Sequence, residues 1–131
     1  MNDLSSTGFA SSTLDFRQIA RGLGSVMRYA SGDIVFREGD DAFYAYIVLT
    51  GTIEVSSHGK VIETVAEGRA FGVISLIDKK PRTATATAMA ASEIAMLDAR
   101  QFRYMVETTP HFVWYVLSEI VERLRATNSA L

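Results

Sequence analysis

Apolar residues recur at helical spacing near the beginning of the chain and again at its end. In the first stretch they share one face of a 3.6-residue period: Leu14, Phe16, Ile19, Ala20 and Leu23. Gly22 and Gly24 interrupt this pattern. The spacing predicts a short helix that begins near Thr13 or Asp15. The serine-rich residues 1–12 before it are expected to form a disordered tail, and residues 13–131 a single domain.

Between about Val26 and Leu97 the period changes to that of β-strands. Runs of roughly five to eight residues rich in Val, Ile, Tyr, Phe and Thr are separated by glycines. The expected strands are Ile34–Phe36, Tyr44–Leu49, the stretch around Ile53 and Val55, Val61–Val65, Thr83–Ala90 and Ile94–Leu97. His58-Gly59 indicates a two-residue hairpin. This pattern of short strands separated by glycines predicts an all-β barrel or sandwich.

After Asp98 the helical period returns. Phe102, Met105 and Val106 predict one helix, and Thr109-Pro110 fits the N-cap and first residue of another. The second helix carries an apolar seam at spacings of four, three and four: Val113, Leu117, Ile120 and Leu124. Such a seam favours a homodimer through this helix. Trp114 and Tyr115 are expected either to pack or to cover a ligand.

Composition narrows the function further. The 131 residues include no cysteine, which excludes disulfides and thiolate metal sites. Their formal net charge of -2 disfavours binding of nucleic acid by the chain alone. No apolar run is long enough to cross a membrane, and we expect a cytoplasmic protein. Two histidines, with no nucleophile motif, make an enzyme or a metal site an unfavoured interpretation.

One segment could bind an anion. Gly72 precedes a short apolar run in which the backbone N–H groups of Ile74 and Ser75 would face outward at a helix start. Arg82 follows through a loop stiffened by Pro81 and could add a guanidinium to the same anion. Taken alone, this pattern more often belongs to a solvated surface loop. An arginine at the mouth of a pocket would contribute little to stability.

Several segments together resemble the cyclic nucleotide-binding domain, as found in bacterial catabolite activators and protein kinase A regulatory subunits. These segments are residues 30–40, 45–55, 71–76 and 81–85, and the resemblance runs from about Leu14 to Ala126. It implies a mainly β fold, an eight-stranded antiparallel β-roll with one leading and two trailing helices. It also implies a regulatory sensor that binds cAMP or cGMP, needs no other cofactor, and signals by movement of its C-terminal helices.

The resemblance assigns roles to individual residues. Arg82 would bind the phosphate, with Ser75, Thr83 and the backbone near Ile74 completing its cradle, and Gly72 would let the chain approach the ribose. Thr83 permits either purine. At the end of the last helix, Thr127 and Asn128 fall where the activator contacts adenine.

One residue departs from the family pattern. The family's Phe-Gly-Glu reads Phe71-Gly72-Val73, so the carboxylate that accepts the ribose 2′-hydroxyl is missing. Weak nucleotide binding, another organic anion, or an empty roll that serves as a dimerisation scaffold all remain open. The chain shows no helix-turn-helix after its last helix, so we expect either a stand-alone sensor acting through a protein partner or part of a larger regulator.

Overall fold

The computed structural model describes residues 15–130. The predicted tail over residues 1–12 lies outside this range. Within it, no helix is both long and apolar enough to cross a membrane.

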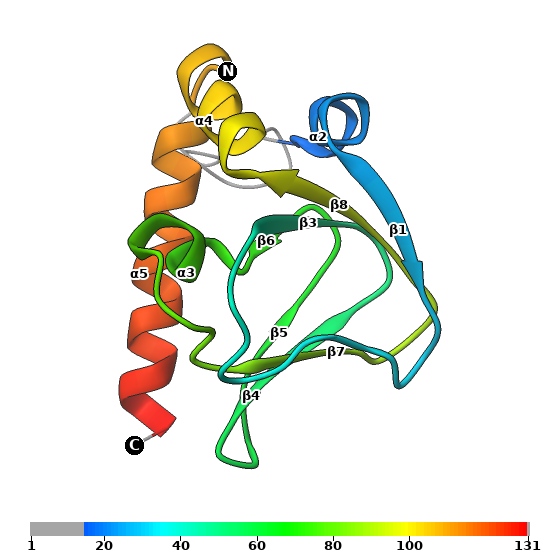
Figure 1. The fold of residues 1–131 in the computed structure, drawn as a ribbon, viewed down its shortest axis with the longest axis vertical. Helices are drawn as coiled ribbons and strands as arrows, with labels where there is room; N and C mark the ends of the chain where they lie inside the picture. The colour runs from blue at the N-terminus through cyan, green and yellow to red at the C-terminus, as the bar shows by residue number, and fades with distance from the viewer. Residues whose placement is uncertain (1–14, 131) are drawn as a thin grey trace, which may run out of the picture.

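Eight strands form two four-stranded antiparallel sheets that curl into a β-roll (Figure 1). The first sheet has the order β1-β8-β3-β6 and the second β2-β7-β4-β5. The strands are β1 (Ser25–Tyr29), β2 (Ile34–Phe36), β3 (Tyr44–Thr50), β4 (Ile53–Ser57), β5 (Lys60–Val65), β6 (Ala70–Phe71), β7 (Thr85–Ala88) and β8 (Ser92–Asp98). The fold class predicted from the sequence is confirmed.

Within the described residues, four helices accompany the roll. They are α2 (Arg17–Leu23), α3 (Val73–Asp78), α4 (Ala99–Thr108) and α5 (Phe112–Ala130). Helix α3 interrupts the strands between β6 and β7 and contacts α5, which runs along the side of the roll (Figure 1). Asp98 caps α4, since its side chain accepts the N–H of Gln101 while Gln101 accepts the N–H of Asp98.

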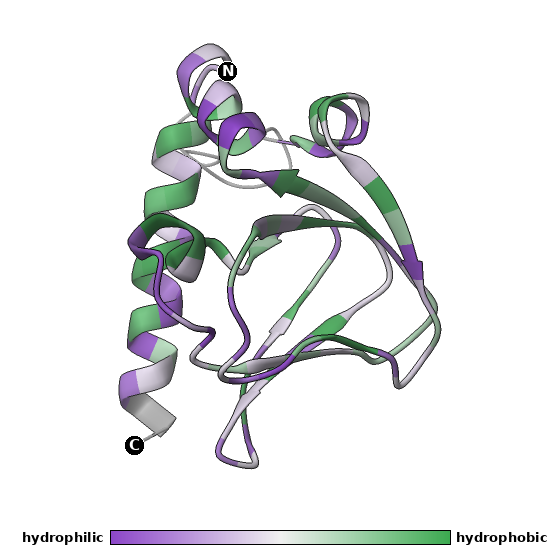
Figure 2. Cartoon of the chain, in the orientation of Figure 1, coloured by the Kyte–Doolittle hydropathy of each residue, from purple (hydrophilic) through white to green (hydrophobic). Residues whose placement is uncertain are grey.

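Strand β3 is buried on both of its faces, so the hydrophobic core is divided into two clusters, one on each face of the strand. Alternate residues Ala45, Ile47 and Leu49 face α2, α4 and α5, whereas Tyr46 and Val48 face the interior of the roll. Figure 2 shows the hydrophobic residues concentrated along β3 and β8. The helices are therefore held to the first sheet by one apolar layer and the two sheets to each other by a second.

The β4–β5 hairpin turns at His58 and Gly59, as predicted. Both residues have positive φ angles, 52° and 79°, and Ser57 pairs with Lys60 across the turn. Positive φ at both central residues gives the turn a twist that matches the flanking strands. The hairpin tip consequently projects from the sheet at one side of the roll (Figure 1).

The start predicted for the last helix is wrong. Helix α4 ends at Thr108 with Thr109 as its C-cap, and α5 begins at Phe112 instead of Pro110. His111 between them has a φ of 67°, a left-handed conformation that no helix can continue through. The apolar residues of α5 also divide between two faces. Phe112, Tyr115 and Val116 are buried on the roll, whereas most of the predicted seam is exposed.

Candidate functional site

A cavity of about 400 Å³ lies between the roll and the helices α3 and α5. Its walls come from β2, β4, β5, the loop that precedes β7, and both helices. The lining residues are Phe36, Val55, Ser57, His58, Ile62, Gly72, Val73, Ile74, Ser75, Arg82, Thr83, Ala84, Arg123, Leu124 and Thr127. Segments far apart in the chain thus converge on one partly open cavity.

The structure brings together seven of the eight residues singled out in the sequence. Those that line the cavity are Gly72, Val73, Ile74, Ser75, Arg82, Thr83 and Thr127. Asn128 is exposed on α5 and is not part of the lining. The two ends of the segment from Gly72 to Thr83 therefore line the cavity together, and α5 contributes further lining residues.

Arg82 is buried, with only 4% of its surface exposed, and does not sit at a pocket mouth. Its Nη1 donates to the carbonyl oxygen of Gly72 at 2.7 Å and its Nη2 to that of Tyr44 at 2.6 Å. Its guanidinium carbon lies 4.1 Å from the centre of the Phe36 ring. Arg82 thereby ties the start of β3 to the turn before α3.

The charge of Arg82 is incompletely balanced. Among the described residues no carboxylate lies within ion-pair distance of it, and its buried Nε has no hydrogen-bond partner. Burial lowers the pKa of the guanidinium, although Tyr46 and Asp40 act in the opposite direction. A buried cation that lines a cavity, with carbonyl dipoles and aromatic rings but no paired carboxylate as its partners, favours the binding of an anion there.

Gly72 makes this arrangement possible. Its φ is 74°, a left-handed conformation, and it directly precedes α3. A Cβ atom at this position would lie 3.0 Å from Arg82 Nη1 and 3.0 Å from Tyr46 Cδ2. Any other residue would be strained and would also press on the guanidinium.

Ser75 and Thr83 line the same cavity as Arg82. Ser75 is buried and its Oγ donates to the carbonyl of Pro81 at 3.3 Å, which leaves its lone pairs available as acceptors. Ile74 and Ser75 belong to the first turn of α3, where backbone N–H groups have no partner within the helix. The carbonyl of Thr83 accepts Ser57 Oγ at 3.3 Å and so joins β4 to this loop.

Sequence reasoning missed the other lining residues. Among them, Phe36, Val55 and Ile62 lie on strands whose alternation shows which side chains are buried but not which ones meet. Arg123 could have been noticed, because it lies four residues before Thr127 and therefore on the same face of a helix. Its neutralisation by Glu63 on β5 depends on packing that no local pattern encodes.

The cavity is cationic and otherwise mostly apolar. Its ionised side chains are the guanidiniums of Arg82 and Arg123, and none of the lining residues is a carboxylate. Throughout the part of the chain that the structure describes, no group of three or more His, Cys, Asp or Glu side chains could hold a metal ion. The arrangement can therefore hold an organic anion, with Arg82 at the negative group and apolar walls around the remainder.

Comparison with known proteins finds a matching family model and several related sequences. The family model of the cyclic nucleotide-binding domain matches residues 26–109. The chain is 32% identical over 77 residues to the cAMP-dependent protein kinase regulatory subunit of Debaryomyces hansenii, a match that covers 57% of this chain and 17% of that protein. It is 34% identical over 87 residues to the cGMP-dependent protein kinase of Eimeria tenella, covering 65% and 9% respectively.

These relatives are much longer proteins. The chain spans 7% to 17% of the length of the first three curated relatives it matches. Its fold is also similar to the crystal structure of the Thermus thermophilus catabolite activator protein, with a TM-score of 0.74, 22% identity, and coverage of 94% of this chain and 59% of that one. Since the family model matches more than half of the residues, the chain belongs to the cyclic nucleotide-binding domain family.

Proposed function

We propose that this chain is a regulatory module, without catalytic activity of its own, whose cavity binds cAMP or cGMP. The observation that carries this proposal is Arg82, a buried cation whose Nε has no hydrogen-bond partner, in a cavity that, among the described residues, no carboxylate lines. A cyclic phosphodiester carries one negative charge, which matches this single incompletely balanced cation. Family membership supports the same ligand class.

The lining suggests how such a ligand would lie. The phosphate would occupy the space beside Arg82, Ser75 and Thr83, while the purine would contact the apolar walls and Thr127 on α5. Val73 presents only methyl groups where the family pattern has a glutamate. We therefore expect binding with weak discrimination for the ribose 2′-hydroxyl, since no charged acceptor is available to it.

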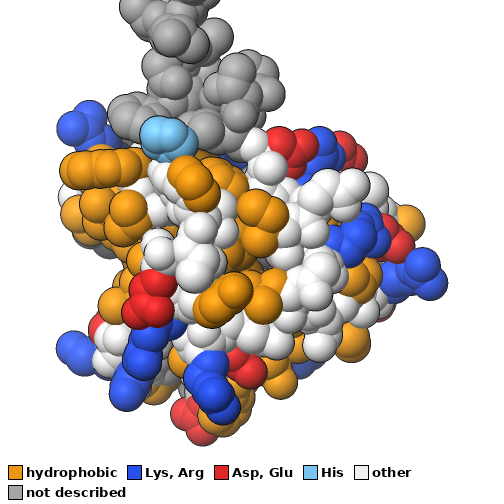
Figure 3. Space-filling model, turned by 90° about the horizontal axis from the view of Figure 1, so that it is seen from above, with side chains coloured by type: hydrophobic (Ala, Val, Ile, Leu, Met, Phe, Trp, Pro, Cys, Tyr) orange, Lys and Arg blue, Asp and Glu red, His pale blue; other side chains and the backbone are white. Residues whose placement is uncertain are grey.

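Occupancy would be read out through α3 and α5, because both helices line the cavity. In this proposal the ligand stabilises the docking of α5 and thereby alters the surface offered to a partner. Helix α5 also exposes Val113, Leu117, Val121 and Leu124, and Trp114 lies beside them. Apolar side chains gather on the α4–α5 side of the molecule (Figure 3), and we propose that α5 forms a homodimer through this stripe. A cytoplasmic location stays a prediction.

Calorimetric titration with cAMP and with cGMP tests the ligand. We expect heat and a thermal shift at micromolar to millimolar nucleotide. Arg82→Lys retains the charge but loses the forked geometry and should abolish most of this response. Arg37→Lys, at an exposed position, is the matched control and should respond like the wild type. Absence of both heat and thermal shift at millimolar nucleotide contradicts the proposal.

A second candidate function is a scaffold that binds no nucleotide. It is favoured by the two hydrogen bonds that Arg82 already makes to Gly72 and Tyr44, which partly satisfy the guanidinium without a ligand. A scaffold predicts dimerisation with no response to either nucleotide. It also predicts that Val73→Glu leaves the protein unresponsive, whereas a weakened binding site would gain affinity.

A further inference from the structure

The two halves of α5 are attached to the roll in different ways. The first half is anchored by buried residues, namely Phe112, Tyr115, Val116 and Glu119. From Val121 to Asn128 no residue is buried. Leu124 and Thr127 in this second half nevertheless line the cavity. The part of α5 that covers the cavity thus lacks the apolar anchor that holds the first part.

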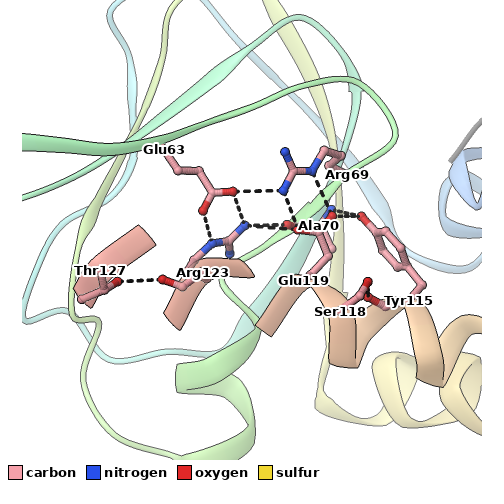
Figure 4. A network of polar contacts seen from close by, with 8 residues as sticks. All are labelled: Glu63, Arg69, Ala70, Tyr115, Ser118, Glu119, Arg123 and Thr127. Atoms are coloured by element: carbon pink, nitrogen blue, oxygen red, sulfur yellow. Dashed lines mark hydrogen bonds and ion pairs between the residues drawn. The ribbon is translucent and has the colours of Figure 1, made fainter. Parts of the chain in front are cut away.

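Arg123 supplies the attachment of the second half. Its Nε donates to Glu63 Oε1 at 2.6 Å, and its Nη2 donates to Glu63 Oε2 at 3.1 Å and to the carbonyl of Ala70 at 3.1 Å (Figure 4). Glu63 lies on β5, and its side chain is only 9% exposed. Within the described residues 121–128, these are the hydrogen bonds that connect α5 to the roll.

The pair belongs to a wider network in which positive and negative groups alternate. Arg69 donates to Glu63 at 3.1 Å and to both oxygens of Glu119, at 2.9 and 2.8 Å (Figure 4). Tyr115 donates to Glu119 at 2.6 Å and accepts the N–H of Ala70 at 2.8 Å. The flanking carboxylates raise the pKa of Arg69. Two guanidiniums and two carboxylates therefore neutralise one another with no ligand present.

Arg123 is the member of this network that also lines the cavity. Its Nε and Nη2 donate to Glu63 and to the carbonyl of Ala70. Its third guanidinium nitrogen, Nη1, has no hydrogen-bond partner among the described residues. Glu63 stays outside the lining. It nevertheless fixes the orientation of a guanidinium that a ligand would meet.

We propose that Glu63 is a positioning residue for the cavity: with Arg123 it forms a latch that holds the second half of α5 across the cavity before any ligand arrives. This inference rests on the proposed function. The ligand would meet Arg123, Leu124 and Thr127 only when the latch is closed. Apparent affinity is then the intrinsic affinity multiplied by the latched fraction. By reciprocity, a ligand must also favour the latched state.

Glu63→Gln tests the latch, because it removes the charge and keeps the shape. Glu122→Gln, an exposed change of the same kind on α5, is the matched control. We would measure hydrogen exchange of the backbone amides of residues 121–128 and titrate each protein with cAMP and cGMP. In Glu63→Gln we expect exchange faster by about tenfold or more, nucleotide affinity weakened by a similar factor, and protection restored by saturating nucleotide. Glu122→Gln should match the wild type.

The results separate the two levels of the proposal. Unchanged exchange in folded Glu63→Gln overturns the latch. Faster exchange with unchanged affinity overturns the positioning role alone. If the wild type binds neither nucleotide, the proposed function fails and the positioning role with it, while exchange in the nucleotide-free protein still decides whether the latch exists. Should Glu63→Gln fail to fold, Glu63→Asp, which withdraws the carboxylate by one methylene, is judged by the same outcomes.

Discussion

The substitution Val73→Glu tests whether position 73 contacts the ribose of the bound nucleotide. Val73 lines the cavity, is 2% exposed, and begins α3 immediately after Gly72. A glutamate there would accept the ribose 2′-hydroxyl. A hydrogen bond to a charged group contributes about 1.5–3 kcal/mol. We therefore expect Val73→Glu to raise the affinity for cAMP and cGMP by about 10- to 150-fold.

The substitution also has a cost to stability. Burying a charge in place of two methyl groups is unfavourable, but Arg82 lines the same cavity, and among the described residues no carboxylate lies within ion-pair distance of it. We expect a loss of about 1–3 kcal/mol in the free energy of unfolding, which leaves the protein folded. Nucleotide should recover part of this loss by mass action.

The assay compares cAMP with its 2′-deoxy analogue in calorimetric titrations of the wild type, Val73→Glu and Val73→Gln. The wild type should bind the two ligands with nearly equal affinity. Val73→Glu should gain affinity for the ribose form alone, and the neutral amide of Val73→Gln should gain less. An equal gain for both ligands, or no gain in folded Val73→Glu, refutes the assignment of this position to the sugar.

Three further predictions concern stability. Arg82→Ala removes two hydrogen bonds and a ring contact, so it should cost about 2–4 kcal/mol in urea unfolding without ligand; an unchanged midpoint would contradict this. Burial raises the pKa of Tyr115 above its ordinary 10.0, so stability should fall as pH rises above 10.0, where only the unfolded phenol ionises. Tyr115→Phe should reduce this dependence of the melting temperature on alkaline pH. Some of the dependence should remain, because burial also raises the pKa of Tyr46. Hydrogen bonds from Arg17 lower the pKa of Asp15 from 3.8 to about 2. The wild type should therefore lose a small amount of stability, below about 1 kcal/mol, as the pH falls from 3.8 to about 2, and melting of Asp15→Asn should not show this loss.

Local patterns predicted the elements that depend on near neighbours. The His58-Gly59 turn and the paired strands around it follow from alternation and from the conformations these residues tolerate. Strand β6 has two residues and no period to detect. Thr109-Pro110 fits a helix start, yet the left-handed conformation of His111 places that start at Phe112.

The candidate site shows the same division. The residues from Gly72 to Thr83 are nearly contiguous, and their spacing is compatible with an anion site, although taken alone it more often belongs to a solvated loop; the resemblance to a known family made them candidates. Arg123 and Phe36 join them only because α5 and β2 pack against the same space, which depends on pairing across the whole chain. The burial of Arg82 could not be predicted either, since its partners are backbone carbonyls that carry no sequence signal.

The crowding around Gly72 limits how this cavity can diversify. The guanidinium of Arg82 and the ring of Tyr46 would both lie within 3.0 Å of any Cβ atom at position 72, so a single substitution there displaces the anion contact and the aromatic packing together. Val55, Ile62 and Leu124 line the cavity through apolar contact alone. A library that varies these three positions and holds Gly72 constant would change the shape of the ligand that the cavity accepts, while the contacts to its negative charge persist. Sequence divergence among related genes would be concentrated at the same three positions.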